Sequence, residues 1–285
     1  MNTYRIPDLA KKFTEHDMIV QHTDLPETPD FRIKLLHTFL SGDAAKDPEN
    51  SEVYSLAVML VQLGLDTHDQ IDTDQGSPQE GDRSRQLKVL AGDYFSSGFY
   101  HLLSKAGHIE AVTSLSAAIC EINRMKMQLY LRMKQWKMTA DEYLQHTVGI
   151  KTQLFLSFAK KMNGVSALRW PELLQAFTRC EVLVQEMESS ELQDPARRNW
   201  AYWHVWERAT KEEKQQLKDG LDRAGWLAVL KKYNVKNALL ELLQSQLQQA
   251  GALIAQFDSD KLRQELGQLG EPFKRYVSSP VLEEI

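Results

Sequence analysis

Three aspartates recur at three-residue intervals in the segment Leu65–Asp72, which reads LDTHDQID. If this segment is helical, Asp66 and Asp69 are neighbours on the helix surface, and so are Asp69 and Asp72. Asp66 and Asp72 lie about 240° apart around the helix axis, so all three cannot share one face. Two carboxylates at this spacing can share a divalent cation, and Mg²⁺ held in this way often carries substrate phosphates. The alternative interpretation is a solvated, acidic helix end without a ligand.

Basic residues follow the acidic segment. Arg83, Arg85 and Lys88 come at or after the end of the polar stretch 73–85, TDQGSPQEGDRSR. This stretch contains glycine and proline and shows no apolar period, so we expect a long loop. The next residues, VLAGDYF, resume a helical pattern and carry a further carboxylate, Asp93. An acidic helix end would then be followed by a cationic loop and a second helix.

The apolar residues that must position these groups recur at helical spacing along nearly the whole chain. Leu56, Leu60 and Leu63 are typical of this period. No segment alternates apolar and polar residues between turn signals, as a strand would. Gly92 and Gly98 lack side-chain bulk, which predicts that another helix approaches closely there, since glycine otherwise destabilises a helix by about 1 kcal/mol relative to alanine. The sequence predicts an all-α fold.

Composition narrows the function classes. Lys plus Arg number 34 and Asp plus Glu 39, so the net charge is 34 − 39 = −5, which argues against a general nucleic-acid binder. Cys120 and Cys180 have no partner at metal-ligand spacing, so we expect neither a zinc site nor a disulfide. The N-terminus lacks a signal-peptide pattern, and the apolar stretch 54–65 is shorter than the roughly 20 residues that span a bilayer. These features predict a soluble, cytoplasmic protein.

The acidic helix end, the basic stretch and the VLAGDYF helix together resemble the first aspartate-rich region of the trans-prenyl diphosphate synthases. Those enzymes carry an HDDVID-like run and an LAGDYLL-like helix. The matching run here, THDQID (67–72), keeps Asp69 and Asp72 but has Gln70 in place of one member of the adjacent aspartate pair. The arginine–glycine pair that follows in the catalytic enzymes is absent in that form. The resemblance implies the isoprenoid-synthase helical bundle.

The chain more closely resembles the small, non-catalytic component of two-subunit heptaprenyl or hexaprenyl diphosphate synthases. Three ordered segments carry this resemblance: LDTHDQI (65–71), RQLKVLAGDYFSSGFYHLLS (85–104) and AAICEINRMKMQLY (117–130). We therefore expect one all-helical domain over residues 1–285, best supported over 53–150, with 165–285 assigned by continuity only. In this family a partner chain carries both aspartate-rich motifs and performs the chemistry.

The rest of the catalytic machinery of the resembling enzymes has no counterpart in the sequence. The acidic pair nearest to their second motif is Asp219 and Asp222, in a charged segment that we expect to be an exposed helix. Arg32 and Lys34 do not form the N-terminal diphosphate clamp of those enzymes, and we expect them at the solvent edge of a helix. No residue of this chain is assigned a catalytic or metal-binding role. Mg²⁺ is expected on the assembled complex, bound mainly by the partner.

Two sets of candidate site residues follow from the resemblance. Those near the substrate region or the subunit interface are Asp66, Asp69, Asp72, Arg83, Arg85, Lys88 and Asp93. A growing polyprenyl tail must be kept out of water, and apolar helices can wall its tunnel. Candidates for that wall or for the interface are Tyr94, Phe95, Phe99, Leu102, Leu103, Ile119, Ile122, Asn123, Lys126 and Tyr130. Ordinary packing inside the chain is the alternative for each member of the second set.

The resemblance implies an auxiliary subunit that a catalytic partner requires to extend farnesyl diphosphate with isopentenyl diphosphate. This subunit would set the length of a hexaprenyl or heptaprenyl product, for the menaquinone side chain. Without the partner, a homodimer could form. One alternative is a helical scaffold or regulator derived from the synthase fold but without prenyl chemistry. Another is a weakly active short-chain synthase that works alone.

Three tryptophans three residues apart offer a separate signal. Trp200 and Trp203 share a helix face, and Trp206 is rotated away from them. Tryptophan is enriched at membrane surfaces, so transient proximity to a membrane is one interpretation. Packing of a peripheral helix is the other.

Overall fold

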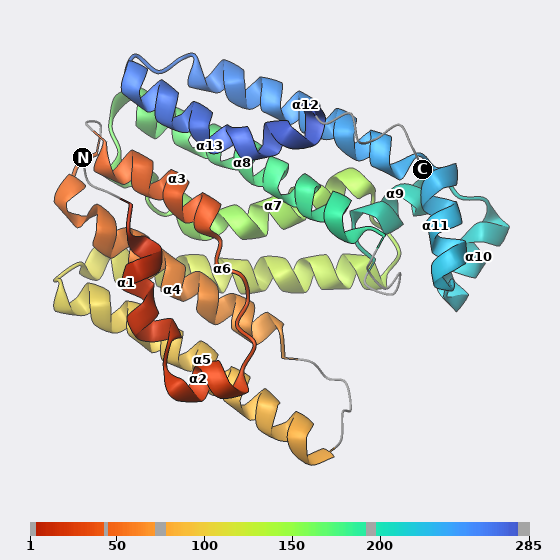
Figure 1. Ribbon diagram of the computed structural model, residues 1–285, viewed down its shortest axis with the longest axis horizontal. Helices are drawn as coiled ribbons and strands as arrows, with labels where there is room; N and C mark the ends of the chain where they lie inside the picture. The colour runs from red at the N-terminus through yellow and green to blue at the C-terminus, as the bar shows by residue number, and fades with distance from the viewer. Residues whose placement is uncertain (1–3, 43–44, 72–77, 192–197, 279–285) are drawn as a thin grey trace. The chain divides into compact units, whose positions relative to one another are not determined.

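Helices make up nearly all of the structure. The computed structural model describes residues 4–42, 45–71, 78–191 and 198–278. Within these ranges there is no strand, and an isolated antiparallel bridge joins Ala45 and Met162. The elements, drawn in Figure 1, are α1 (Ile6–Thr14), α2 (Asp17–His22), α3 (Asp30–Ser41), η1 (Pro48–Asn50), α4 (Ser51–Asp69), α5 (Pro78–Lys105), α6 (Ile109–Lys134), α7 (Ala140–Leu156), η2 (Ala159–Lys161), α8 (Gly164–Ser189), α9 (Trp200–Arg208), α10 (Lys211–Asp219), α11 (Arg223–Lys232), α12 (Val235–Ile254) and α13 (Asp260–Ser278). The all-α prediction is confirmed.

The contacts divide the chain into two compact units. Unit 1 contains Met1–Ile119 and Leu154–Leu168, and unit 2 contains Cys120–Gln153 and Arg169–Ile285. The division falls within α6, α7 and α8. The expectation of one domain over residues 1–285 stays a prediction.

Helix α4 is the central element of unit 1. Its residues from Tyr54 to Gly64 are buried without a break, including the polar Ser55 and Gln62. A helix that is apolar on every side must be covered on every side. Helices α1, α3 and α5 pack on α4, and α5 makes the most extensive contact. The acidic end of α4 is therefore held by a rigid, buried support.

Glycines set the close approach of α4 and α5. A Cβ atom at Gly64 would lie 2.9 Å from Ser96 Oγ and 3.0 Å from the Gly92 carbonyl oxygen. A Cβ atom at Gly92 would lie 2.6 Å from His68 Nε2, and one at Gly98 would lie 3.3 Å from the Phe13 ring. The prediction that Gly92 and Gly98 permit close helix approach is confirmed.

The start of α5 differs from the prediction. Residues 73–85 were expected to form a loop, but α5 begins at Pro78, so the expectation is wrong for 78–85. Proline is well suited to the first turn of a helix because its missing N–H has no partner there. The segment 78–85, PQEGDRSR, carries no apolar period, which explains why hydrophobic periodicity did not reveal this part of the helix.

Unit 2 is built on α7, α8 and the helices that follow them. Large aromatic residues fill its core, with Trp170, Trp203 and Trp226 almost fully buried. Helix α12 packs against α13, and α9 contacts α11 and α12. Asn199 caps α9 by accepting a hydrogen bond from the backbone N–H of Tyr202.

Candidate functional site

The acidic residues occupy the last turn of α4. Asp66 is half-buried, and Asp69 is exposed at the C-terminal residue of the helix. They are i,i+3 neighbours, as the spacing predicted. Asp72 lies outside the described residues. The structure thus places two of the three candidate aspartates on one helix end.

A buried polar chain reaches Asp66 from α3. The Gln62 side-chain amide donates to Asp66 Oδ1 at 2.8 Å, and the Gln62 Oε1 atom lies 3.5 Å from the Arg32 Nη1 donor. Arg32 is only 2% exposed, and its guanidinium lies 5.2 Å from the centroid of the Phe155 ring. A buried cation is thereby coupled to the carboxylate through one amide.

The expectation that Arg32 lies at the solvent edge of its helix is therefore wrong, whereas Lys34 is exposed as expected. A sequence signal for the burial exists. Arg32 is three and four residues from Leu35 and Leu36, so it shares the apolar face of α3.

Two contacts from α5 tie it to the same end of α4. His68 Nε2 lies 3.5 Å from Asp93 Oδ1, and the Lys88 ammonium donates to the Gln70 carbonyl oxygen at 3.3 Å. A cation beside the last carbonyls of a helix also favours the negative end of the helix dipole. Lys88 and Asp93 thus lie at the acidic end.

Arg83 is exposed and Arg85 is half-buried, both in the part of α5 that precedes these contacts. Both stay candidates for positive charge near the substrate region or the subunit interface.

The apolar candidates on α5 divide by exposure. Phe95 and Leu103 are fully buried and Phe99 nearly so, whereas Leu102 is half-buried. Tyr94 is 40% exposed, and its ring contacts the rings of Phe13, His16 and Phe95. Of this group, Tyr94 offers the most surface to a ligand or a partner chain.

The candidates on α6 show the same split. Ile119 is half-buried in unit 1. In unit 2, Ile122 is buried and Lys126 half-buried, whereas Asn123 and Tyr130 are exposed. Met127 and Leu131 are also exposed, although methionine at this spacing would ordinarily be assigned to the core. Exposed apolar side chains thus gather on the C-terminal half of α6.

Carboxylates elsewhere have ordinary roles. Asp222 caps α11 by accepting the backbone N–H of Gly225 at 2.8 Å, and Asp219 accepts a hydrogen bond from the Gln215 amide. Within the described ranges, no three His, Cys, Asp or Glu side chains are arranged to hold a metal ion.

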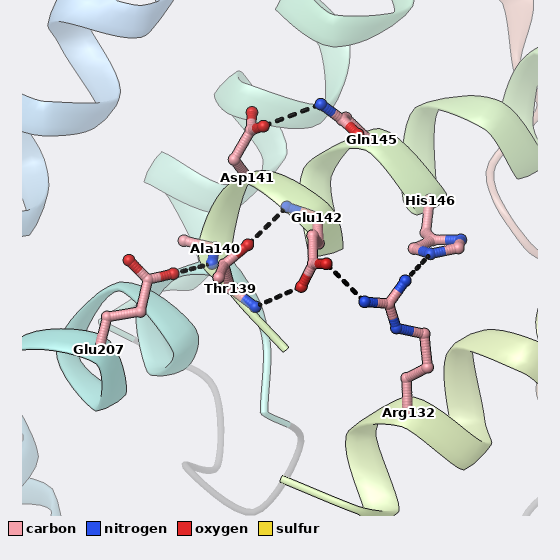
Figure 2. A network of polar contacts seen from close by, with 8 residues as sticks. All are labelled: Arg132, Thr139, Ala140, Asp141, Glu142, Gln145, His146 and Glu207. Atoms are coloured by element: carbon pink, nitrogen blue, oxygen red, sulfur yellow. Dashed lines mark hydrogen bonds and ion pairs between the residues drawn. The ribbon is translucent and has the colours of Figure 1, made fainter. Parts of the chain in front are cut away.

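A polar network in unit 2 fixes the connection between α6 and α7 (Figure 2). Thr139 and Glu142 form a capping box, in which Glu142 Oε2 accepts the Thr139 N–H at 2.9 Å and Thr139 Oγ1 accepts the Glu142 N–H at 3.1 Å. Arg132 donates to the other Glu142 oxygen and contacts His146. The Thr139 N–H, and to a lesser degree Arg132, hold the pKa of Glu142 below its usual range. The T-x-x-E spacing could have revealed this cap.

Residues 16–224 match the family described as heptaprenyl diphosphate synthase (HEPPP synthase) subunit 1. The chain belongs to this family. The matched residues include the acidic end of α4, the α5 contacts and the α6–α7 network.

A curated relative is heptaprenyl diphosphate synthase component 1 of Geobacillus stearothermophilus, 33% identical over 147 residues. The alignment covers 51% of this chain and 62% of the relative, which is less than two thirds of the relative's length. The relative's activity as a whole therefore enters only as a proposal.

Solved structures with the same fold include two geranylgeranyl pyrophosphate synthases and a decaprenyl diphosphate synthase. A geranylgeranyl pyrophosphate synthase from Lactobacillus brevis gives a TM-score of 0.71 at 16% identity, covering 95% of this chain and 94% of that one. A decaprenyl diphosphate synthase from Rhodobacter capsulatus gives 0.70 at 16% identity, with 97% and 90% covered. A geranylgeranyl pyrophosphate synthetase from Pyrococcus horikoshii gives 0.66 at 18% identity, with 96% and 97% covered. At these identities the likeness establishes the fold alone.

Proposed function

We propose that this chain is the auxiliary subunit of a two-subunit heptaprenyl-type diphosphate synthase and acts with a catalytic partner. The partner would hold Mg²⁺ and join isopentenyl diphosphate units to farnesyl diphosphate, and the complex would make a menaquinone side chain. One observation carries the proposal. The family match spans the acidic end of α4, and directly after it Gln70 stands where the catalytic enzymes have one member of an adjacent aspartate pair. Ionising an allylic diphosphate requires concentrated positive charge against the developing anion, which metal ions commonly supply.

We place the contact with the partner on the exposed side of α6. Met127 is 61% exposed and Tyr130 58% exposed, and Leu131 adjoins them. Aromatic and methionine side chains are enriched in protein–protein interfaces, and a cluster of them on one helix is well suited to a partner helix. Asn123, on the same helix, would add a polar contact.

The second part of the proposal concerns the end of α4. Positive charge near Asp66 and Asp69 would come from Arg32, Lys88, Arg83 and Arg85. The diphosphate of the substrate or an acidic segment of the partner would lie there. Tyr94, exposed on α5, would contact the growing tail and influence product length. The buried Phe95, Phe99 and Leu103 would support Tyr94 from within the core of unit 1.

The test is incorporation of labelled isopentenyl diphosphate with farnesyl diphosphate and Mg²⁺. This chain alone, the candidate catalytic chain alone and their mixture are assayed, and products are resolved by length. We expect long products only from the mixture. Equal activity with and without this chain would favour a scaffold without prenyl chemistry, and activity from this chain alone would identify a self-sufficient synthase.

Variants separate the two parts of the proposal. Tyr130→Glu should weaken assembly by roughly tenfold or more, so that excess partner restores the rate. The matched control is Gln244→Glu, which adds the same charge at an exposed position of α12.

Replacing Asp69 and Asp72 by Asn should lower the rate without changing assembly. Unchanged activity and product length in that double variant would mean that the acidic pair is only solvated surface.

A further inference from the structure

Two tryptophans of unit 2 remain partly open to solvent. Trp136 follows α6, and Trp206 lies near the end of α9. Their ring centroids are 4.6 Å apart, and both side chains are half-buried. Trp200 and Trp203, by contrast, are buried, so packing of the helix is the correct interpretation for those two. The solvent-accessible pair therefore joins Trp206 to a tryptophan outside α9.

Three cations lie over the rings of this pair. The Arg198 guanidinium is 3.9 Å from the Trp136 ring centroid. Lys218 Nζ is 5.1 Å from the Trp136 centroid and 5.6 Å from that of Trp206, and Lys214 Nζ is 5.5 Å from the Trp206 centroid. Cations at these distances are attracted to the negative faces of indole rings. We call Trp136, Trp206, Arg198, Lys214 and Lys218 the tryptophan–cation patch.

Carboxylates on α7 and α9 are bound to other groups. Figure 2 shows three of them, each with its own partner: Glu142 with Arg132 and Thr139, Asp141 with Gln145, and Glu207 with the Ala140 N–H. Among the described residues, none forms an ion pair with Arg198, Lys214 or Lys218. The three cations of the patch therefore have no direct carboxylate partner among the described residues.

The backbone supports the same pairing. Trp136 has φ 59° and Arg198 has φ 45°, so both occupy the left-handed region that side chains other than glycine rarely adopt. These two residues are the ones whose indole and guanidinium stack. Strained conformations of this kind cluster at functional sites, where the surrounding structure maintains them. The Arg198 guanidinium also donates to the Met133 carbonyl oxygen at 3.4 Å, which fixes its position.

We propose that the tryptophan–cation patch docks this chain on the surface of an anionic lipid bilayer. The cations would contact lipid phosphates, and the edges of the two indoles would lie at headgroup depth, where tryptophan is enriched. Exposed Lys134 and Lys137 flank Trp136 in sequence and add to the positive charge. None of the described helices is long and apolar enough to cross a bilayer, so contact would be confined to the surface. This inference does not depend on the partner subunit.

The test uses the full-length chain and vesicles of phosphatidylglycerol or of phosphatidylcholine. Cosedimentation measures binding, and tryptophan emission reports the indoles. We expect binding to the anionic vesicles only, with a blue shift of emission. Lys214→Gln with Lys218→Gln should weaken binding by roughly tenfold or more, because each cation near the surface contributes about a factor of five. Lys231→Gln with Lys236→Gln removes the same charge at exposed positions of α11 and α12 and is the matched control.

Several results would overturn the proposal. Equal binding of the two double variants would mean that attraction is general rather than local to the patch. A change of emission with inorganic diphosphate, without vesicle binding, would identify a site for a soluble anion. Loss of vesicle binding in the presence of the candidate catalytic chain would assign the patch to that protein instead. Circular dichroism of each variant excludes unfolding as the cause.

Discussion

Glu186, on α8, is a carboxyl group that the core of unit 2 encloses. It is 8% exposed and lies beside Tyr143, and its Oε2 atom has no hydrogen-bond partner among the described residues. Burial raises its pKa to about 7, although the backbone N–H groups of Trp200 and Ala201 at the start of α9 oppose the rise. The protein thus stabilises one end of α9 with a group that is uncharged below neutral pH.

The sign of the pH dependence follows from this rise in pKa. The folded state binds a proton at Glu186 more tightly than the unfolded state, whose pKa is near 4.5. The stability contributed by the protonated group is therefore present below about pH 4.5 and is lost as the pH rises to about 7.

We predict that Glu186→Gln gains stability relative to the original chain by roughly 2–3 kcal/mol between about pH 4.5 and pH 8. Urea unfolding of both proteins at each pH gives the difference, so that other titrating groups cancel. A difference that stays constant with pH would show that Glu186 titrates normally.

Residue types alone located part of the candidate site. The i,i+3 spacing predicted that Asp66 and Asp69 share a helix end, and the helical period placed Lys88 and Asp93 on the following helix. The contact between Arg32 and Gln62 could not be predicted in the same way, because two residues 30 positions apart meet only when α3 packs on α4. An arginine in a sequence such as FRIKLL is predicted to be exposed unless the helix face that it shares with the apolar residues is considered.

At the scale of elements, α4 and α5 lie close together because glycines leave no side chain between them. Gly64 faces the backbone of Gly92, which cannot move away without bending α5. Gly92 instead faces the imidazole of His68, which is half-exposed and can rotate. The two glycines therefore differ in how much a methyl group would disturb the pair.

We predict that Gly64→Ala lowers the free energy of unfolding by about 1–3 kcal/mol, as expected for overpacking. Gly92→Ala should have a smaller effect, because the ring can yield. Gly251→Ala in α12 is the matched control: its Cβ atom would have no neighbour within 4 Å, so higher helix propensity should stabilise the chain by about 0.5–1 kcal/mol. Denaturant melts measure all three, and a neutral Gly64→Ala would contradict the close approach.

Helix existence was predictable over much of the chain, whereas two features of the elements were not. The start of α5 at Pro78 has no apolar period, since residues 78–85 are polar apart from glycine and proline. The pairing of Trp136 with Trp206 joins the α6–α7 connection to α9, and neither residue lies on an apolar stripe that would indicate the other. The first is a helical segment without apolar residues and the second is a tertiary contact, and hydrophobic periodicity indicates neither.

At the scale of the whole molecule, one question is whether units 1 and 2 unfold together. All six tryptophans lie in unit 2, whereas both units are helical. Tryptophan fluorescence therefore follows unit 2 alone, and far-ultraviolet circular dichroism follows the entire chain. A single cooperative domain requires that the two signals change at the same denaturant concentration.

We predict coincident transitions, because α6, α7 and α8 each include residues of both units, and a continuous helix couples the stability of its two halves. Gly64→Ala makes the test sharper, because it alters unit 1 and changes no tryptophan. In a cooperative domain it must lower the fluorescence midpoint of unit 2 as much as the circular dichroism midpoint. A fluorescence midpoint that does not move, beside a circular dichroism curve that splits into two steps, would mean that the chain consists of two domains.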